Sequence, residues 1–242
     1  MINKIKKEIP NVITLGNLLC GCLGIYFIFK GDESLAGYMI IVAAVLDFFD
    51  GFVARLLKVQ SPLGKELDSL ADVVTFGVLP GFILLKIMID DSLSELNIEP
   101  LFAYTAFLVP LFSAYRLAKF NIDARQSDRF IGVPTPANGM VVASFALIMN
   151  QNPDGFIGNI LLNHEEYVAI YAVIISILLV AEIPLIALKF KKFNLKDNIF
   201  RYLLIVSSII LIVLLQIESI PYIFIVYFLV SLLENLTTNK LK

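Results

Sequence analysis

Four aspartates lie close together in a strongly apolar part of the sequence, at spacings that suit helices. Asp47 and Asp50 are three residues apart, and Asp68 and Asp72 are four residues apart. On a helix, side chains at these spacings share one face. The link between the two pairs is short enough for the two faces to meet. We therefore expect four carboxylates to converge near the ends of two consecutive helices.

Carboxylates gathered in an apolar environment repel one another and lose their hydration, so a positive charge must hold them. Hard divalent cations prefer clustered carboxylate oxygens, and Mg²⁺ is usually bound by a few carboxylates together with substrate phosphates. The aspartates therefore predict a site for Mg²⁺ or Mn²⁺. A pair of ions bridging phosphate groups would account for all four side chains.

The residues that follow Asp50 suit a phosphate-bearing ligand. Gly51 and Ala54 have almost no side chain, so a bulky phosphate or sugar can approach the backbone. Arg55 offers a planar fork of donors that matches phosphate geometry. Taken singly, the small residues are better explained by helix packing, and Arg55 by an ordinary positive charge at the inner boundary of the membrane. The whole array favours ligand binding.

The composition indicates the environment of this array. The chain has 242 residues, of which 58% are hydrophobic and only 17% charged, and its mean hydropathy is +0.84. These values exclude an ordinary soluble domain. We expect an all-α, polytopic membrane bundle that forms a single domain over residues 1–242. No small-residue cleavage site follows the first lysines, which predicts that the N-terminus is retained.

A membrane helix needs about 20 mostly apolar residues. The sequence predicts about eight transmembrane helices, near residues 11–30, 35–57, 68–89, 101–120, 134–150, 167–188, 200–217 and 220–236. Eight spans place both termini on the same side as the breaks near 58–67, 121–133 and 189–199. All basic residues except Lys30 and Lys86 then fall on that side. Because positive residues are retained in the cytoplasm, the sequence predicts a multi-pass protein of the cell (inner) membrane with cytoplasmic termini and a cytoplasmic active site.

The array also carries a family resemblance. Its residues fit the signature D-x2-D-G-x2-A-R-x8-G-x3-D-x3-D, with Gly64 as the second glycine, and so resemble the CDP-alcohol phosphatidyltransferase family. The resemblance implies two divalent ions, with Asp47, Asp50 and Asp68 as principal ligands. It implies that Asp72 acts as the general base and serves as a further ligand.

The resemblance extends to residues expected near the nucleotide of a CDP-linked lipid. Ser61 falls where related enzymes have a small polar residue. Asn11, Thr14 and Asn17 resemble the first-helix segment that lines the CDP site. An equally open interpretation of this segment is a helix start in the interfacial region. The expected CDP-lipid-binding residues are Gly51, Ala54, Arg55, Ser61, Gly64, Asn11, Thr14 and Asn17.

Two later segments bear on the acceptor alcohol. Residues 116–121 read RLAKFN and residues 132–138 read GVPTPAN. They resemble the R-L-A-R-F-N and P-x-P-A segments of the bacterial membrane-spanning phosphatidylserine synthases within the family, with Lys119 in place of arginine. The resemblance covers about residues 8–145, the expected catalytic half. The additional helices, about 167–236, match only in hydropathy.

The resemblance implies transfer of a phosphatidyl group from CDP-diacylglycerol to the hydroxyl of L-serine. No residue of the sequence resembles an activated covalent nucleophile, so we expect a single step through a ternary complex. Serine brings a carboxylate, which Arg116 could bind, and Lys119 and Asn121 are further candidates for acceptor binding. The alternative interpretation is that Arg116, Lys119, Arg125 and Arg129 serve topology and attraction to anionic lipid. The expected partners are CDP-diacylglycerol, L-serine and membrane lipids, with no nucleic acid; a homodimer is expected from the resemblance alone.

Two other functions remain open from the sequence. Within the family, the acceptor could be glycerol 3-phosphate or an inositol compound, since a phosphorylated acceptor would suit the basic residues after 116. From another class, a membrane cation transporter could use intramembrane aspartates as its ion site. Against the transporter, the aspartates are expected at helix ends on one side, and no broken-helix repeat is visible.

Overall fold

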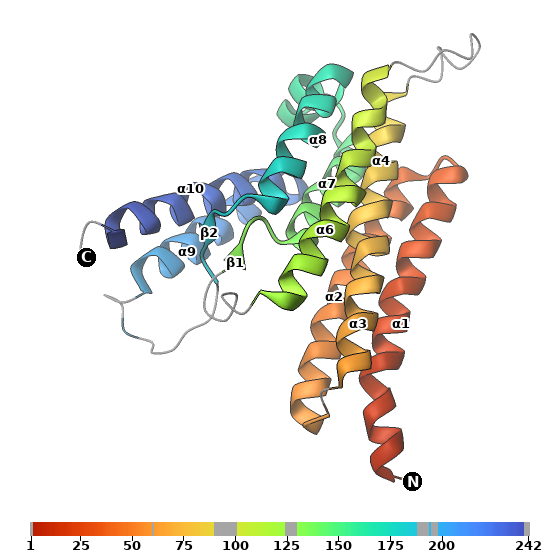
Figure 1. Ribbon diagram of the computed structural model, residues 1–242. Coiled ribbons are helices and arrows are strands. Elements are labelled where there is room, and N and C mark those ends of the chain that lie inside the picture. Colours follow the sequence, from red (N-terminus) through yellow and green to blue (C-terminus); the bar gives the residue numbers. More distant parts are fainter. Residues whose placement is uncertain are drawn as a thin grey trace.

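The computed structural model describes residues 2–59, 61–89, 101–123, 130–187, 194 and 198–239, most of them in helices (Figure 1). In chain order the helical elements are α1 (Ile2–Phe29), α2 (Glu33–Leu57), α3 (Pro62–Asp72), the π-helical η1 (Val73–Val78), α4 (Leu79–Met88), the 3₁₀ segment η2 (Leu101–Phe107), α6 (Leu108–Ile122), α7 (Thr135–Gln151), the π-helical η3 (Gly158–Leu162), α8 (Glu165–Val180), α9 (Ile199–Leu215), the 3₁₀ turn η5 (Gln216–Glu218) and α10 (Ser219–Asn239). The short strands β1 (Phe130–Ile131) and β2 (Pro184–Leu185) pair antiparallel. The expected all-α class is confirmed.

The third helix begins earlier than expected, at Pro62 rather than at 68. Lys58 ends α2 with a positive φ of 53°. Ser61 then caps α3, because its Oγ accepts a hydrogen bond from the backbone N of Gly64 over 3.0 Å, and proline fits the first helical turn. Gly64, Asp68 and Asp72 consequently lie four residues apart on one helical face.

The sixth helix ends earlier than expected, at Val180 rather than at 188. Pro184 has no N–H to continue a helix and disfavours helical backbone in the residue before it. The chain becomes extended and forms β2. The first helix also differs from the expected range, since it begins at Ile2 and contains Pro10.

Among the described residues, four helical segments are long and apolar enough to cross a membrane: Glu8–Phe29, Pro62–Met88, Leu101–Ile122 and Ile199–Thr237. The chain is therefore a multi-pass helical membrane protein. α7 and α8, with 17 and 16 residues, are shorter than the ~20 residues of a typical span. The expected count of eight crossings remains a prediction.

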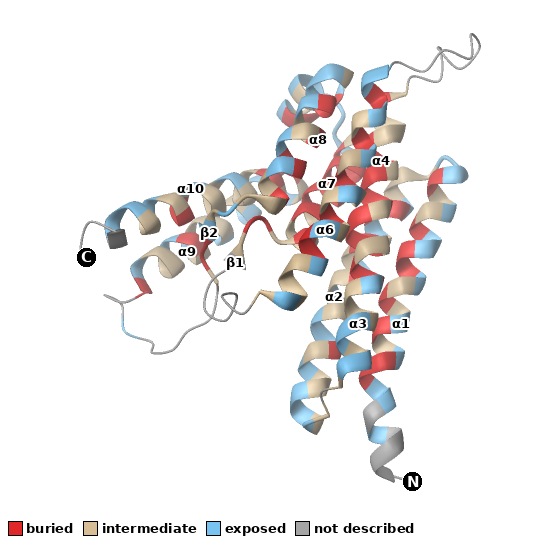
Figure 2. Ribbon diagram, in the orientation of Figure 1, coloured by how far each residue is buried: buried red, intermediate tan, exposed pale blue. Residues whose placement is uncertain are grey.

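α7 forms the centre of the bundle. Its residues from Val141 to Ile148 are all buried, and buried residues gather where α4, α6 and α7 meet (Figure 2). A helix that is apolar all round must be covered on every side. α7 is therefore enclosed by its neighbours, and its first turn is held in a fixed position between them.

The last segment forms a hairpin of α9 and α10, which lie side by side and run across the direction of α1 to α4 (Figure 1). The chain reverses at Gln216, whose φ is 47°. Val213 and Leu214 are among many exposed apolar side chains on this hairpin. Such a surface requires a lipid or protein environment.

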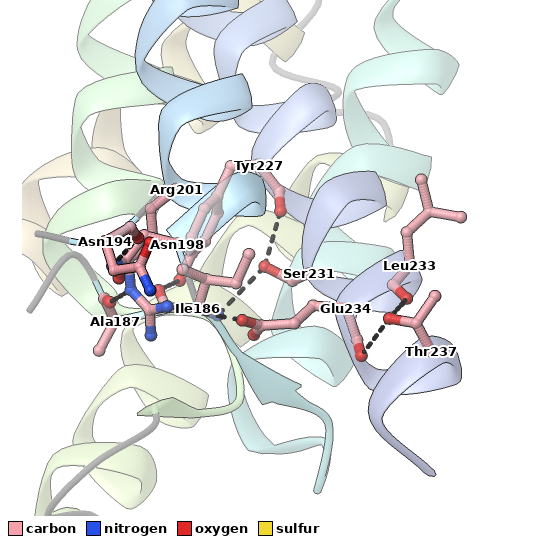
Figure 3. Close-up of polar contacts among 10 residues, drawn as sticks. All are labelled: Ile186, Ala187, Asn194, Asn198, Arg201, Tyr227, Ser231, Leu233, Glu234 and Thr237. Carbon is pink, nitrogen blue, oxygen red and sulfur yellow. Dashed lines mark hydrogen bonds and ion pairs between the residues drawn. The ribbon is translucent and has the colours of Figure 1, made fainter. Parts of the chain in front are cut away.

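Hydrogen bonds attach the hairpin to the extended segment after α8 (Figure 3). Ser231 Oγ accepts from the Ile186 backbone N over 3.2 Å, and the Tyr227 hydroxyl donates to the Ile186 carbonyl over 3.0 Å. Arg201 of α9 forms an ion pair with Glu234 of α10 at 3.6 Å. The hairpin thus holds β2, and β2 pairs with β1, the strand that leads into the first turn of α7.

Candidate active site

Three of the four predicted carboxylates meet between α2 and α3. Asp47, Asp50 and Asp68 each offer an oxygen atom within 4.8 Å of the other two. Asp50 is buried, and the other two are half-buried. Thr14 of α1 donates from Oγ1 to Asp50 Oδ2 over 2.7 Å, which orients that carboxylate. Clustered carboxylate oxygens are the ligand set that a hard divalent cation prefers.

Asp72 lies one helical turn beyond Asp68 and is buried, with 7% of its surface exposed. It is close enough to the other three aspartates to interact with them electrostatically. Asn17 donates from Nδ2 to Asp72 Oδ1 over 3.3 Å, and Thr75 donates to the Asn17 carbonyl over 3.1 Å. The fourth carboxylate therefore extends the cluster towards the interior of the bundle.

A cavity of about 500 Å³ adjoins the cluster between α1, α2 and α3. Most of the residues expected to bind the CDP-linked lipid line it: Asn11, Thr14, Gly51, Ala54, Ser61 and Gly64. A Cβ atom added to Gly51 would meet only Arg55 Nη1, at 3.9 Å, so this glycine faces open space. The cavity has the size of a small-molecule site and shares Asp50 and Asp68 with the carboxylate cluster.

Two residues expected near the CDP group do not line this cavity. Asn17 is fully buried beside Asp72. Arg55 is exposed in the last turn of α2. Lys65, which is not among the expected residues, does line the cavity, and its Nζ donates to the Asn121 carbonyl over 2.7 Å. Its position directly after the signature glycine was the signal that could have found it.

Arg116 of α6 is a buried cation. It is 5% exposed, and Asp72 and Tyr227 are the ionisable groups that interact with it electrostatically. Its Nη1 donates to Thr135 Oγ1 over 3.1 Å, and its guanidinium lies 5.8 Å from the centre of the Phe120 ring. Its Nε has no hydrogen-bond partner among the described residues.

The other candidates for acceptor binding have partners of their own. Lys119 forms an ion pair with Glu182 at 3.0 Å, which ties α6 to the segment after α8. Asn121 donates from Nδ2 to Ser69 Oγ over 2.8 Å, which ties α6 to α3. Arg125 and Arg129 lie outside the described residues.

Comparison with known proteins identifies the chemistry of this arrangement. The model of the CDP-alcohol phosphatidyltransferase family matches residues 7–187. The chain belongs to this family. The match contains all four aspartates, the cavity and Arg116, and it ends before α9. CDP-alcohol phosphatidyltransferases use a CDP-linked substrate, as the family name states, and the carboxylate cluster is consistent with the divalent metal binding typical of the family.

Relatives within the family share most of the chain. A Bacillus subtilis protein is 39% identical over 139 residues, which cover 57% of this chain and 75% of the relative. A Helicobacter pylori protein is 33% identical over 189 residues, 77% of this chain and 75% of the relative. A Methanocaldococcus jannaschii protein is 31% identical over 206 residues, 85% and 83% of the two chains. All three are named CDP-diacylglycerol–serine O-phosphatidyltransferase.

Proposed function

We propose that this CDP-alcohol phosphatidyltransferase transfers the phosphatidyl group of CDP-diacylglycerol to the hydroxyl of L-serine, giving phosphatidylserine and CMP. The names of the relatives support the choice of serine. The observation that carries it is Arg116, a guanidinium buried beside Asp72 without an ion-pair partner among the described residues. A buried, unpaired charge is costly, so this position calls for an anion. The serine carboxylate supplies that anion close to the proposed base.

Asp72 is the proposed general base. It takes the proton of the serine hydroxyl while that oxygen attacks the lipid-side phosphorus, and the bond from phosphorus to the CMP oxygen breaks. The hydrogen bond from Asn17 orients the Asp72 carboxylate, and its place one turn after Asp68 on α3 directs it towards the cluster. The sequence offers no pattern typical of an activated covalent nucleophile, and we therefore propose a single displacement through a ternary complex.

Asp47, Asp50 and Asp68 are the proposed principal metal ligands, with Asp72 as a further ligand and two Mg²⁺ or Mn²⁺ ions as the cofactors. When bound, divalent ions would neutralise the pyrophosphate oxygens and stabilise the departing CMP. The cavity residues Gly51 and Gly64 leave room for the nucleotide beside this cluster. Arg55 is exposed in the last turn of α2, where it is available to a phosphate group of the substrate.

The proposed topology has eight spans, with both termini and the active site on the cytoplasmic side of the inner membrane. The charge distribution supports this orientation. The hairpin of α9 and α10 adds an even number of crossings however deeply it enters the membrane, so it does not change the side on which the C-terminus lies. The domain assignment is a single membrane domain with its catalytic half at about residues 8–145, and a homodimer is proposed on the resemblance alone.

The two alternatives predict different chemistry. A phosphorylated acceptor such as glycerol 3-phosphate would need further cations to bind its phosphate. An inositol compound without a phosphate would leave Arg116 without an anion. Lys119 is engaged by Glu182, which weakens the case for a phosphorylated acceptor. A cation transporter would not need a 500 Å³ cavity beside the carboxylates.

The test is to supply the purified protein with CDP-diacylglycerol, Mg²⁺ or Mn²⁺, and a panel containing serine, glycerol 3-phosphate and inositol compounds. CMP release that depends on serine supports the proposal. Release with another acceptor and none with serine overturns the serine assignment. A phosphatidyl-enzyme intermediate, or ping-pong kinetics, would contradict the single displacement.

A further inference from the structure

Several buried polar atoms on the helices that contact η1 lack a hydrogen-bond partner within the part of the chain that the structure describes. They are Asn17 Oδ1, Ser113 Oγ, Arg116 Nε and Asn138 Nδ2. Leaving a buried donor or acceptor unpaired is costly, and more so for a charged group. These atoms come from α1, α6 and α7, which all contact η1, the segment that directly follows Asp72. Their shared position around this segment points to a ligand.

Asn138 lies one helical turn after Thr135, the residue that accepts the hydrogen bond from Arg116. Side chains three residues apart on a helix are neighbours, with Cβ atoms about 5–6 Å apart. Asn138 is fully buried. The adjacent Gly139 packs against Phe76 of η1, where an added Cβ would meet the Phe76 ring at 2.9 Å. The first turn of α7 therefore faces the segment that directly follows Asp72.

Tyr171 of α8 orients the Asn138 amide. Its hydroxyl donates to Asn138 Oδ1 over 2.7 Å, and the ring packs edge-on against Phe145, with centroids 5.1 Å apart. Because the amide oxygen is occupied, the unpaired group is the Nδ2 donor. This donor is one helical turn from Thr135, the residue that contacts a buried guanidinium with an unpaired Nε. Donors of these two kinds match the needs of a carboxylate, which accepts several hydrogen bonds.

We propose that Asn138 binds the acceptor substrate by donating from Nδ2 to its carboxylate, alongside Arg116. Asn138 is then a specificity residue for a carboxylate-bearing alcohol, and Tyr171 is the positioning residue that holds its amide. This inference rests on the proposed transfer to serine. The competing explanation is that Asn138 and Tyr171 form only a structural hydrogen bond between α7 and α8.

The first test compares Asn138→Ala with Ser144→Ala in the full-length protein. Ser144 is a matched control, since it is also buried in α7 and donates only to the Val141 carbonyl of its own helix. Asn138→Ala should raise the KM for serine by about 10- to 100-fold, the range for a lost hydrogen bond to a charged group. The KM for CDP-diacylglycerol should change less than about twofold, because Asn138 is not proposed to contact that substrate. Ser144→Ala should retain both parent values.

A second measurement separates binding from structure. Ethanolamine is serine without its carboxylate, so the rate of the parent with ethanolamine should be low, and Asn138→Ala should reduce it little further. Tyr171→Phe, which keeps the ring but frees the Asn138 amide, should raise the serine KM in the same direction as Asn138→Ala. This variant keeps the test available if Asn138→Ala does not fold.

The outcomes distinguish the two proposals. An unchanged serine KM in both Asn138→Ala and Tyr171→Phe overturns the role of Asn138, as does an equal loss with serine and ethanolamine. If the parent releases no CMP with serine, the proposed function itself fails. An enzyme that uses serine but is indifferent to Asn138 retains its proposed function and loses only this inference.

Discussion

Asn17 in α1 donates a hydrogen bond from Nδ2 to Oδ1 of Asp72 in α3, over 3.3 Å and 55 residues of sequence. Both residues are buried, so α1 determines the orientation of the innermost carboxylate. We predict that Asp72→Asn lowers turnover by about 100- to 10,000-fold, the usual contribution of a general base, while CDP-diacylglycerol still binds. Single-turnover kinetics and a lipid-binding assay check this. Turnover close to the parent value would exclude Asp72 as the base.

The metal-binding role of the carboxylate cluster predicts that charge is essential. Asp50→Asn and Asp68→Asn retain the size of the side chain but remove its charge, so each should abolish turnover while the protein remains folded in the membrane. EDTA should abolish the activity of the parent, and added Mg²⁺ or Mn²⁺ should restore it. Activity that survives EDTA, or that persists in either variant, would disprove a metal-dependent reaction.

Arg116 should act on the acceptor rather than on the lipid. Arg116→Lys retains the charge but loses the planar fork, so the main effect should be a higher KM for serine with little change for CDP-diacylglycerol. Serine methyl ester should be a poor acceptor for the parent and should lose little more in the variant. If the ester serves as well as serine, the carboxylate contact is wrong.

Gly51 allows stability and activity to be separated. Gly51→Ala replaces a helical glycine with a better helix former, which should leave the melting temperature unchanged or raise it. The new methyl group would project into the cavity, where it meets no atom closer than Arg55 Nη1. The KM for CDP-diacylglycerol should therefore rise. Gly16→Ala is the control, since its Cβ would meet Leu46 at an ordinary 3.4 Å, away from the cavity.

The proposed orientation can be tested with single cysteines, after Cys20 and Cys22 are replaced by serine. Lys58 and Asp154 are both exposed and lie on opposite sides in the proposed topology. A cysteine at 58 should resist a membrane-impermeant thiol reagent in intact cells, and one at 154 should react. The reverse pattern would place the active site away from the cytoplasm.

The sequence by itself determined the helical membrane class and the core of the site. Helix positions follow from long apolar runs, because each span is set locally by about 20 residues. Asp47, Asp50 and Asp68 meet because they lie on two helices joined by a tight link. Helical spacing and one reversal, both local features, are enough to bring these carboxylates together. Two predicted helix ends were wrong. The third helix begins earlier than predicted, at Pro62, and the sixth ends earlier than predicted, before Pro184.

Only the tertiary structure decided the partners of the residues outside the signature. Arg116 contacts Thr135, Lys119 pairs with Glu182, and Asn138 meets Tyr171. The sequence favoured Arg116 over Lys119 for the acceptor by resemblance, but it placed both only as basic residues on one side of the membrane. Which of them faces Asp72 depends on the rotation of α6 against α3, α7 and the segment after α8. That rotation is set by packing between helices distant in the chain, and hydrophobic periodicity does not encode it, because a helix that is buried on most sides has no single polar face.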